Sequence, residues 1–106
     1  MPKYLIRASY SQSGIAGVLR EGGSSRVKAI HSLASSVGGS VECIYWALGD
    51  DDFVMIADMP DNTSAAAVAA TVGASGAATV RTTPLLTADD VDQLGSKSVE
   101  YRPPGT

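Results

Sequence analysis

Two neighbouring segments of the chain are apolar on both faces when each is read as a strand. The first covers residues 40–48 and the second covers residues 53–59, with the acidic turn Gly49-Asp50-Asp51-Asp52 between them. This spacing predicts a β-hairpin. An antiparallel sheet with one face in water normally alternates apolar with polar side chains, so this hairpin needs cover on both faces.

Two further strands and four helices are predicted around the hairpin. Residues 4–10 alternate like a strand, with Tyr4 and Ile6 on one face and Arg7 on the other, and residues 78–83 predict a fourth strand. Helical spacing, capping residues and glycine stops predict the helices. They are a short helix ending at Gly22-Gly23, a longer one from Ser24 or Ser25 to Val37, an alanine-rich one over residues 65–72 capped by Asn62, Thr63 or Ser64, and a last one over residues 88–94 capped by Thr87.

The order of these elements predicts an α+β fold of the ferredoxin-like βαββαβ type, in residues 1–95, followed by a loosely held tail over residues 96–106. Right-handed crossovers place both main helices on one face of a four-stranded antiparallel sheet. No helix is left to cover the other face. We therefore expect the chain to pair with a second copy of itself, sheet against sheet.

Composition excludes several classes of protein. Only 18% of the residues are charged and the net charge is -3, with basic residues scattered singly, so we expect no nucleic-acid partner. The lone cysteine, Cys43, excludes a disulfide within the chain. No apolar run approaches the roughly twenty residues of a membrane helix, and no signal segment opens the chain. We expect a cytoplasmic protein with no membrane partner.

Short motifs follow one another in order from residue 2 to residue 91. They are Pro2-Lys3-Tyr4-Leu5-Ile6, Gly14-Ile15, Gly38-Gly39, the turn at residues 49–52 with Phe53-Val54, Pro60-Asp61, and Val80-Arg81-Thr82-Thr83. Together they resemble the GYD-domain family of small bacterial proteins. The resemblance implies a ferredoxin-like fold that pairs into a dimeric α/β barrel, and it implies no established activity. That family is named for a glycine, a tyrosine and an aspartate in the hairpin turn; this chain keeps Gly49 and Asp52 but has Asp51 where the tyrosine is expected.

Five residues are candidates for binding a small ligand. Because the first and last strands are neighbours in this fold, Arg7 and Arg81 can form a site for a carboxylate or phosphate between the helices and the sheet. The alternative is that they pair with carboxylates such as Asp52 or Asp58, or lie at a dimer rim. Three aromatic residues could form the walls of such a site, or they could instead fill the core or a dimer interface. They are Tyr10, Tyr45 and Trp46.

Catalytic candidates are weaker. His31, the only histidine, could act as a general base or could be a boundary residue with a solvated ring. Asp52 could act as a base, or its carboxylate could accept backbone N–H groups of the turn. Consecutive carboxylates at residues 50–52 point in different directions, so we expect no metal, and the glycines match no phosphate-binding fingerprint, so we expect no cofactor.

Three functions remain open from the sequence. The first is a dimeric module that binds a small anionic or aromatic molecule. The second is a cofactor-independent enzyme, such as an isomerase or a monooxygenase-like protein. The third is a structural protein whose only activity is assembly. A cleft that contains His31 or Asp52 would favour the enzyme, whereas a cleft lined only by arginine and aromatic side chains would favour binding.

Overall fold

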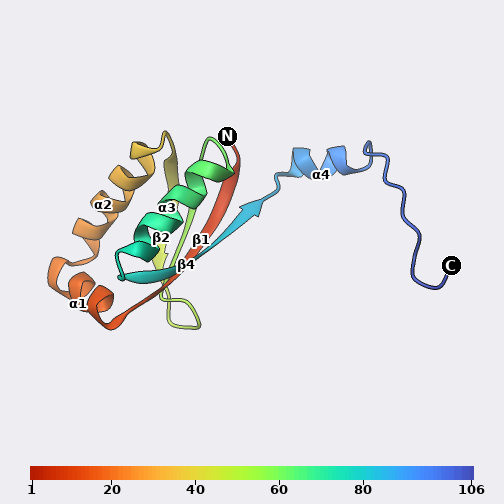
Figure 1. The fold of residues 1–106 in the computed structure, drawn as a ribbon. Helices are drawn as coiled ribbons and strands as arrows, with labels where there is room; N and C mark the ends of the chain where they lie inside the picture. Colours follow the sequence, from red (N-terminus) through yellow and green to blue (C-terminus); the bar gives the residue numbers. More distant parts are fainter.

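The predicted order of strands and helices is confirmed by the computed structural model, which describes all 106 residues (Figure 1). The elements are β1 (Lys3–Tyr10), α1 (Gln12–Glu21), α2 (Gly23–Ser36), β2 (Ser40–Trp46), β3 (Phe53–Asp58), α3 (Asn62–Ala74), β4 (Ala78–Leu85) and α4 (Ala88–Leu94). The strands form one antiparallel sheet in the order β2-β3-β1-β4. The fold is therefore α+β and ferredoxin-like.

One face of the sheet packs under α2 and α3, and the core lies between these layers. Every second side chain is buried from Tyr4 to Ala8 in β1 and from Phe53 to Ala57 in β3. The buried residues are all apolar: Tyr4, Ile6, Ala8, Ile30, Ala34, Phe53, Met55, Ala57, Met59, Ala65 and Val68. No helix covers the other face, which we call the open face.

Strand β2 departs from the predicted alternation. A bulge between Val41 and Cys43 inserts one extra residue, Glu42, opposite β3. Val41 and Ile44 consequently both pack against the core, while Cys43 pairs with Ile56. In a regular strand Val41 and Cys43 would share a face; here they do not, because an inserted residue reverses the inward and outward positions on one side of it.

Local signals explain where the helices begin. Gly22 separates α1 from α2 with a φ of 86°, a left-handed conformation that favours glycine. The cap of α3 is Asp61, whose side chain accepts the Ser64 N–H, so the expectation of a cap at residues 62–64 is wrong by one position or more. The predicted cap of α4 is confirmed, since Thr87 and Asp90 form a reciprocal capping box.

The last twenty-one residues stand apart from the rest of the molecule. Figure 1 shows α4 and the C-terminal tail extending away from the sheet beyond the end of β4, and the longest dimension of the molecule is 58 Å. All hydrogen bonds of α4 and the tail stay within this segment. No helix in the chain combines the length and the hydropathy that a bilayer crossing requires.

Candidate functional site

The sheet divides the predicted ligand-binding residues between its two faces. Arg7 and Arg81 lie directly opposite each other on β1 and β4, so their predicted adjacency is confirmed. Both point to the open face, however, because the alternate residues Ile6 and Ala8 are the buried ones. The expectation that the two arginines lie between the helices and the sheet is therefore wrong.

The aromatic candidates, unlike the arginines, lie on both faces of the sheet. Tyr10 packs against the core, and Trp46 makes an edge-to-face contact with Phe53, with ring centroids 5.7 Å apart. The Trp46 indole Nε1 donates to Tyr10 Oη at 3.1 Å. Tyr45, pairing with Val54, lies on the open face and is 65% exposed.

An apolar cleft of about 70 Å³ lies between α2, α3 and the sheet. The cleft exists because α2 and α3 both rest on the sheet but scarcely touch each other. Eleven of its twelve lining residues are hydrophobic, and the exception is Arg26. The lining consists of Ile6, Ala8, Tyr10, Arg26, Ile30, Leu33, Phe53, Met55, Val68, Val72, Ala78 and Val80.

Arg26 gives this cleft its one charged group. Its Nη1 lies 3.5 Å from Glu21 Oε2, and the arginine side chain is one-third exposed. Arg26 also borders a second, adjoining hollow beside α1, together with Tyr10 and Glu21. The Arg26 guanidinium therefore lies at the edge of the apolar cleft and is partly exposed to solvent. Tyr10 lines both the cleft and the adjoining hollow beside it.

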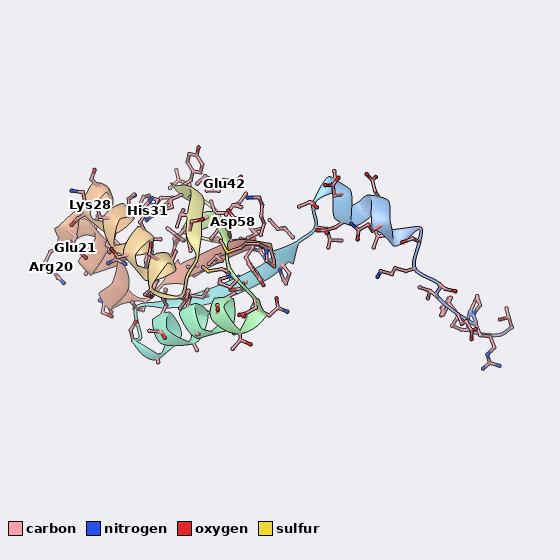
Figure 2. All side chains as sticks on the ribbon, turned by 90° about the horizontal axis from the view of Figure 1, so that it is seen from above. Arg20, Glu21, Lys28, His31, Glu42 and Asp58 are labelled. Carbon is pink, nitrogen blue, oxygen red and sulfur yellow. The ribbon has the colours of Figure 1, made fainter.

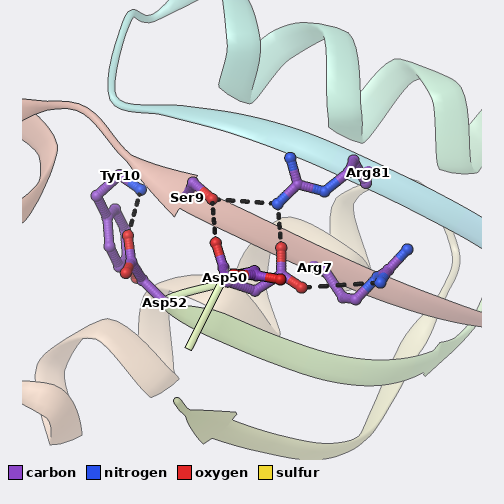
Figure 3. A network of polar contacts seen from close by, with 7 residues as sticks. Arg7, Ser9, Tyr10, Asp50, Asp52 and Arg81 are labelled. Atoms are coloured by element: carbon purple, nitrogen blue, oxygen red, sulfur yellow. Dashed lines mark hydrogen bonds and ion pairs between the residues drawn. The ribbon is translucent and has the colours of Figure 1, made fainter. Parts of the chain in front are cut away.

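On the open face, the two arginines meet the hairpin turn (Figure 3). Asp51 accepts a hydrogen bond from Arg81 Nη2, and its Oδ2 lies 3.8 Å from Arg7 Nη1. Arg81 Nη2 also donates to Ser9 Oγ at 3.1 Å. The pairing partner is therefore Asp51, and neither Asp52 nor Asp58 fills that role.

Asp52 has a different local role from the one expected. Its carboxylate accepts the Tyr10 N–H at 2.9 Å, and its own N–H donates to the Ala8 carbonyl at 2.9 Å. The carboxylate therefore bonds to β1, whereas the sequence suggested the backbone of the turn. These two bonds continue the pairing of β1 with β3 to the residue before Phe53, where β3 begins, and hold the turn against β1.

The other end of the open face carries a second polar cluster. Lys3 Nζ donates to Asp58 Oδ1 at 3.0 Å and lies 3.4 Å from Glu42 Oε1. The hydrogen bond to Asp58, with Glu42 adding to it, raises the pKa of Lys3. Between the two polar clusters the open face is apolar, formed by Leu5, Cys43, Tyr45, Val54 and Ile56.

Neither catalytic candidate lies in the cleft. His31 is exposed on α2, one turn after Lys28 (Figure 2), and is not part of the cleft lining. Asp52 lies at the hairpin turn, also outside the lining. No group of three or more His, Cys, Asp or Glu side chains is arranged to hold a metal ion.

Sequence reasoning missed two residues. Arg26 precedes Ile30 and Leu33 by one and two helical turns, and this spacing places it on the apolar stripe of α2. That signal was available. For Asp51 the sequence indicates no role beyond the acidic turn, because nothing local shows that the turn folds back over β1 to reach both arginines.

Comparison with known proteins gives one family. No curated protein and no solved structure matches the chain. A family model, that of the GYD domain, matches residues 4–94 of the 106, which covers all strands and helices except Lys3, the first residue of β1. The chain therefore belongs to the GYD domain family.

Proposed function

We propose that this GYD-domain chain is a self-associating module that binds a small aromatic carboxylate in the cleft between α2, α3 and the sheet. The observation that carries the proposal is the cleft lining, which is hydrophobic apart from Arg26. Concave, mostly apolar sites with one or a few polar groups are typical of small-molecule binding. The ligand class is the one expected from the sequence, but the arginine and most of the lining are different residues.

The size and polarity of the cleft support an aromatic ring as the buried part of the ligand. Its volume of about 70 Å³ is several times the roughly 10–15 Å³ that one water needs and about half of the roughly 150 Å³ cavity that takes up benzene, so the cleft accepts part of a ring and does not enclose it. Apolar cavities bind apolar groups in preference to water. Tyr10 and Phe53 in the wall favour ring stacking or edge-to-face contact.

Arg26 supplies the polar end of the proposed complex. A guanidinium at the edge of an apolar space donates parallel hydrogen bonds to a carboxylate, and such charge-assisted bonds are about twice as strong as neutral ones. In the free chain the partner of Arg26 is Glu21, at 3.5 Å and close to solvent. A ligand carboxylate therefore competes only with a partly solvated ion pair, which contributes little.

Binding is favoured over catalysis because the cleft lining contains no His, Asp, Glu, Lys or Cys side chain, and Tyr10 is its only hydroxyl group. Proton transfer requires a titratable group within hydrogen-bond reach of the reacting atom. His31 and Asp52 are both outside the lining, and the Tyr10 hydroxyl accepts a bond from Trp46. An enzyme and a purely structural protein remain the alternatives.

Calorimetric titration with benzoate tests this proposal. We expect saturable binding to the wild-type chain, weaker binding of benzyl alcohol, and at least about a tenfold loss of benzoate affinity in R26Q. R20Q is the matched control, since Arg20 lies on the exposed surface of α1 and forms no ion pair. Absence of saturable benzoate binding, or equal losses in R26Q and R20Q, would refute the proposal.

Self-association rests on a separate observation, the apolar middle of the open face. Its residues lie on three adjacent strands and no helix covers them. Contiguous apolar surface of this kind marks an interaction site in most soluble domains. A second copy is the proposed partner, because a twofold axis brings the same apolar strip onto itself and lets the polar clusters at each end form the rim.

Sedimentation velocity tests this second part independently of any ligand. We expect a dimer at micromolar concentration for the wild-type chain and a monomer for V54K, which places a charge in the middle of the strip. A67K adds the same charge on the exposed surface of α3 and should remain dimeric. A monomeric wild-type chain would contradict self-association and leave the benzoate test unaffected.

A further inference from the structure

The open face carries two arginines that face each other across adjacent strands. Arg7 and Arg81 are direct partners in the register of β1 and β4. Like charges placed opposite each other on a sheet are unfavourable unless an anion lies between them. The pair therefore needs a counter-anion, and in the free chain that anion is the Asp51 carboxylate.

One carboxylate does not neutralise two guanidinium groups. Arg81 has two hydrogen-bond acceptors, the Asp51 carboxylate and Ser9 Oγ. Arg7 differs: its Nη1 is 3.8 Å from Asp51 Oδ2, beyond hydrogen-bond distance, and its Nε is buried without an acceptor. Buried donors without partners are rare in folded proteins and unfavourable.

The Asp51 side chain can leave this position without opening the hairpin. Three other bonds hold the turn to β1: Asp52 N–H to the Ala8 carbonyl, Tyr10 N–H to the Asp52 carboxylate, and Ser9 Oγ to the Asp50 carbonyl. None of them uses Asp51. A rotation of the Asp51 side chain would therefore free the arginines while the backbone of the turn stays in place.

We propose that Arg7 and Arg81 form a binding site for a small oxyanion, a carboxylate or a phosphate, and that Asp51 is an internal ligand that the oxyanion displaces. A free oxyanion carries two or three acceptor oxygens and can satisfy both guanidinium forks at once. Arg81 lies on the edge strand β4, so the pair is reachable from the side of the sheet. The site is on the opposite face from the cleft and does not depend on the function proposed for it.

Titration with inorganic phosphate and with acetate, followed by the NMR signals of the arginine Nε–H groups, tests the proposal. At fixed ionic strength, D51N should bind phosphate at least about tenfold more tightly than the wild-type chain, because the competing carboxylate is gone. D50N is the matched control: it removes the same charge from the same turn, where only the Asp50 backbone carbonyl is used. The double variant D51N/R81Q should lose the gain.

Equal phosphate affinity in D51N and D50N would overturn the proposal. The proposal would also fail if D51N raised self-association without raising phosphate affinity. The arginines would then bind a carboxylate of a second copy of the chain. If D51N does not fold, the wild-type titration decides the matter. In that case R7Q and R81Q must each abolish the phosphate-induced shifts and R20Q must leave them unchanged; any other pattern refutes the site.

Discussion

Tyr4 Oη donates a 2.6 Å hydrogen bond to Asn62 Oδ1, and this bond joins the middle of the sheet to the first turn of α3. The Tyr4 ring is 1% exposed. The two residues are 58 positions apart in the sequence. The bond adds a polar contact to the burial of Ala65 and Val68, the two residues that α3 buries in the core.

We expect Y4F to lower the free energy of unfolding by about 1 kcal/mol, the net contribution of a typical intramolecular hydrogen bond. In the Y4F background, N62A should then cost nothing further through this contact, because its donor is already absent. Urea denaturation of the two single variants and the double variant measures this coupling. Strictly additive losses would show that the bond contributes nothing to stability.

Gly14 and Gly17 lie in the same helix and should respond in opposite ways to alanine. A Cβ at Gly14 would clash with the Ala77 carbonyl oxygen, which accepts hydrogen bonds from Ser11 N–H and Ser11 Oγ. G14A should therefore destabilise the chain by roughly 1–3 kcal/mol. At Gly17 the nearest atom is the flexible end of Arg20, 3.9 Å away, so G17A should stabilise it by about 0.5–1 kcal/mol through helix propensity.

Thermal and urea unfolding of both variants provide the measurement. The comparison is informative because the substitution and the helix are the same, and only the surroundings differ. If G14A proved as stable as the wild-type chain, α1 would not dock against the start of β4 as described.

The cap of α3 predicts a pH dependence. The Ser64 N–H bonds to the Asp61 carboxylate at 2.8 Å and holds the pKa of Asp61 below its ordinary value of 3.8. A carboxyl whose pKa is lower in the folded state stabilises that state above the unfolded pKa, and this contribution is lost as the pH falls through the folded pKa. The cap is therefore fully effective at neutral pH and weakens below about pH 4.

D61A should lower the melting temperature by roughly 4–8 °C at pH 7. The difference from the wild-type chain should narrow as the pH falls below 3.8. D61N is the control, because asparagine is also a good cap but does not titrate. Melting curves recorded between pH 2 and pH 7 provide the measurement. If the difference in melting temperature between D61A and the wild-type chain stayed constant with pH, the carboxylate would not be the capping group.

The order of the elements could be predicted because it depends on local signals. Gly22 ends α1 as expected, and Thr87 caps α4 as expected. The predicted start of α2 at Ser24 or Ser25 is wrong, because Gly22 is also its cap and Gly23 is its first residue. The adjacency of Arg7 and Arg81 followed from the topology alone. Their direction was wrong although the signal was present: Tyr4, Ile6 and Ala8 form the apolar side of the same strand, so Arg7 had to face away from the helices.

The cleft could not be predicted because it depends on the distance between two helices. Periodicity shows which side of α2 faces the sheet, but not how far α2 lies from α3. The bulge at Glu42 was likewise hidden, since an inserted residue does not change the composition of a strand. Asp51 illustrates the same limit, because its partners come from strands about 30 and 44 positions away.

The segment of residues 86–106 gives the last prediction. It exposes Leu86, Val91, Leu94, Val99 and Tyr101. Helix α4 has seven residues, and isolated helices shorter than about 12–15 residues are marginal in water. Within one chain, nothing packs against these side chains. Truncation after Leu85 should therefore change the free energy of unfolding of a dilute, monomeric sample by less than about 0.5 kcal/mol.

Melting curves of the full and truncated chains over a range of protein concentrations provide the measurement, with V91S as a control that keeps the full length. A loss of stability on truncation that is present even in the dilute sample would show that the segment packs on its own domain, against this prediction. A loss that develops only as the concentration rises would place the segment against a second copy. In that case mass action couples the segment to the proposed self-association, and V91S should reproduce part of the loss because it removes one of the exposed apolar side chains.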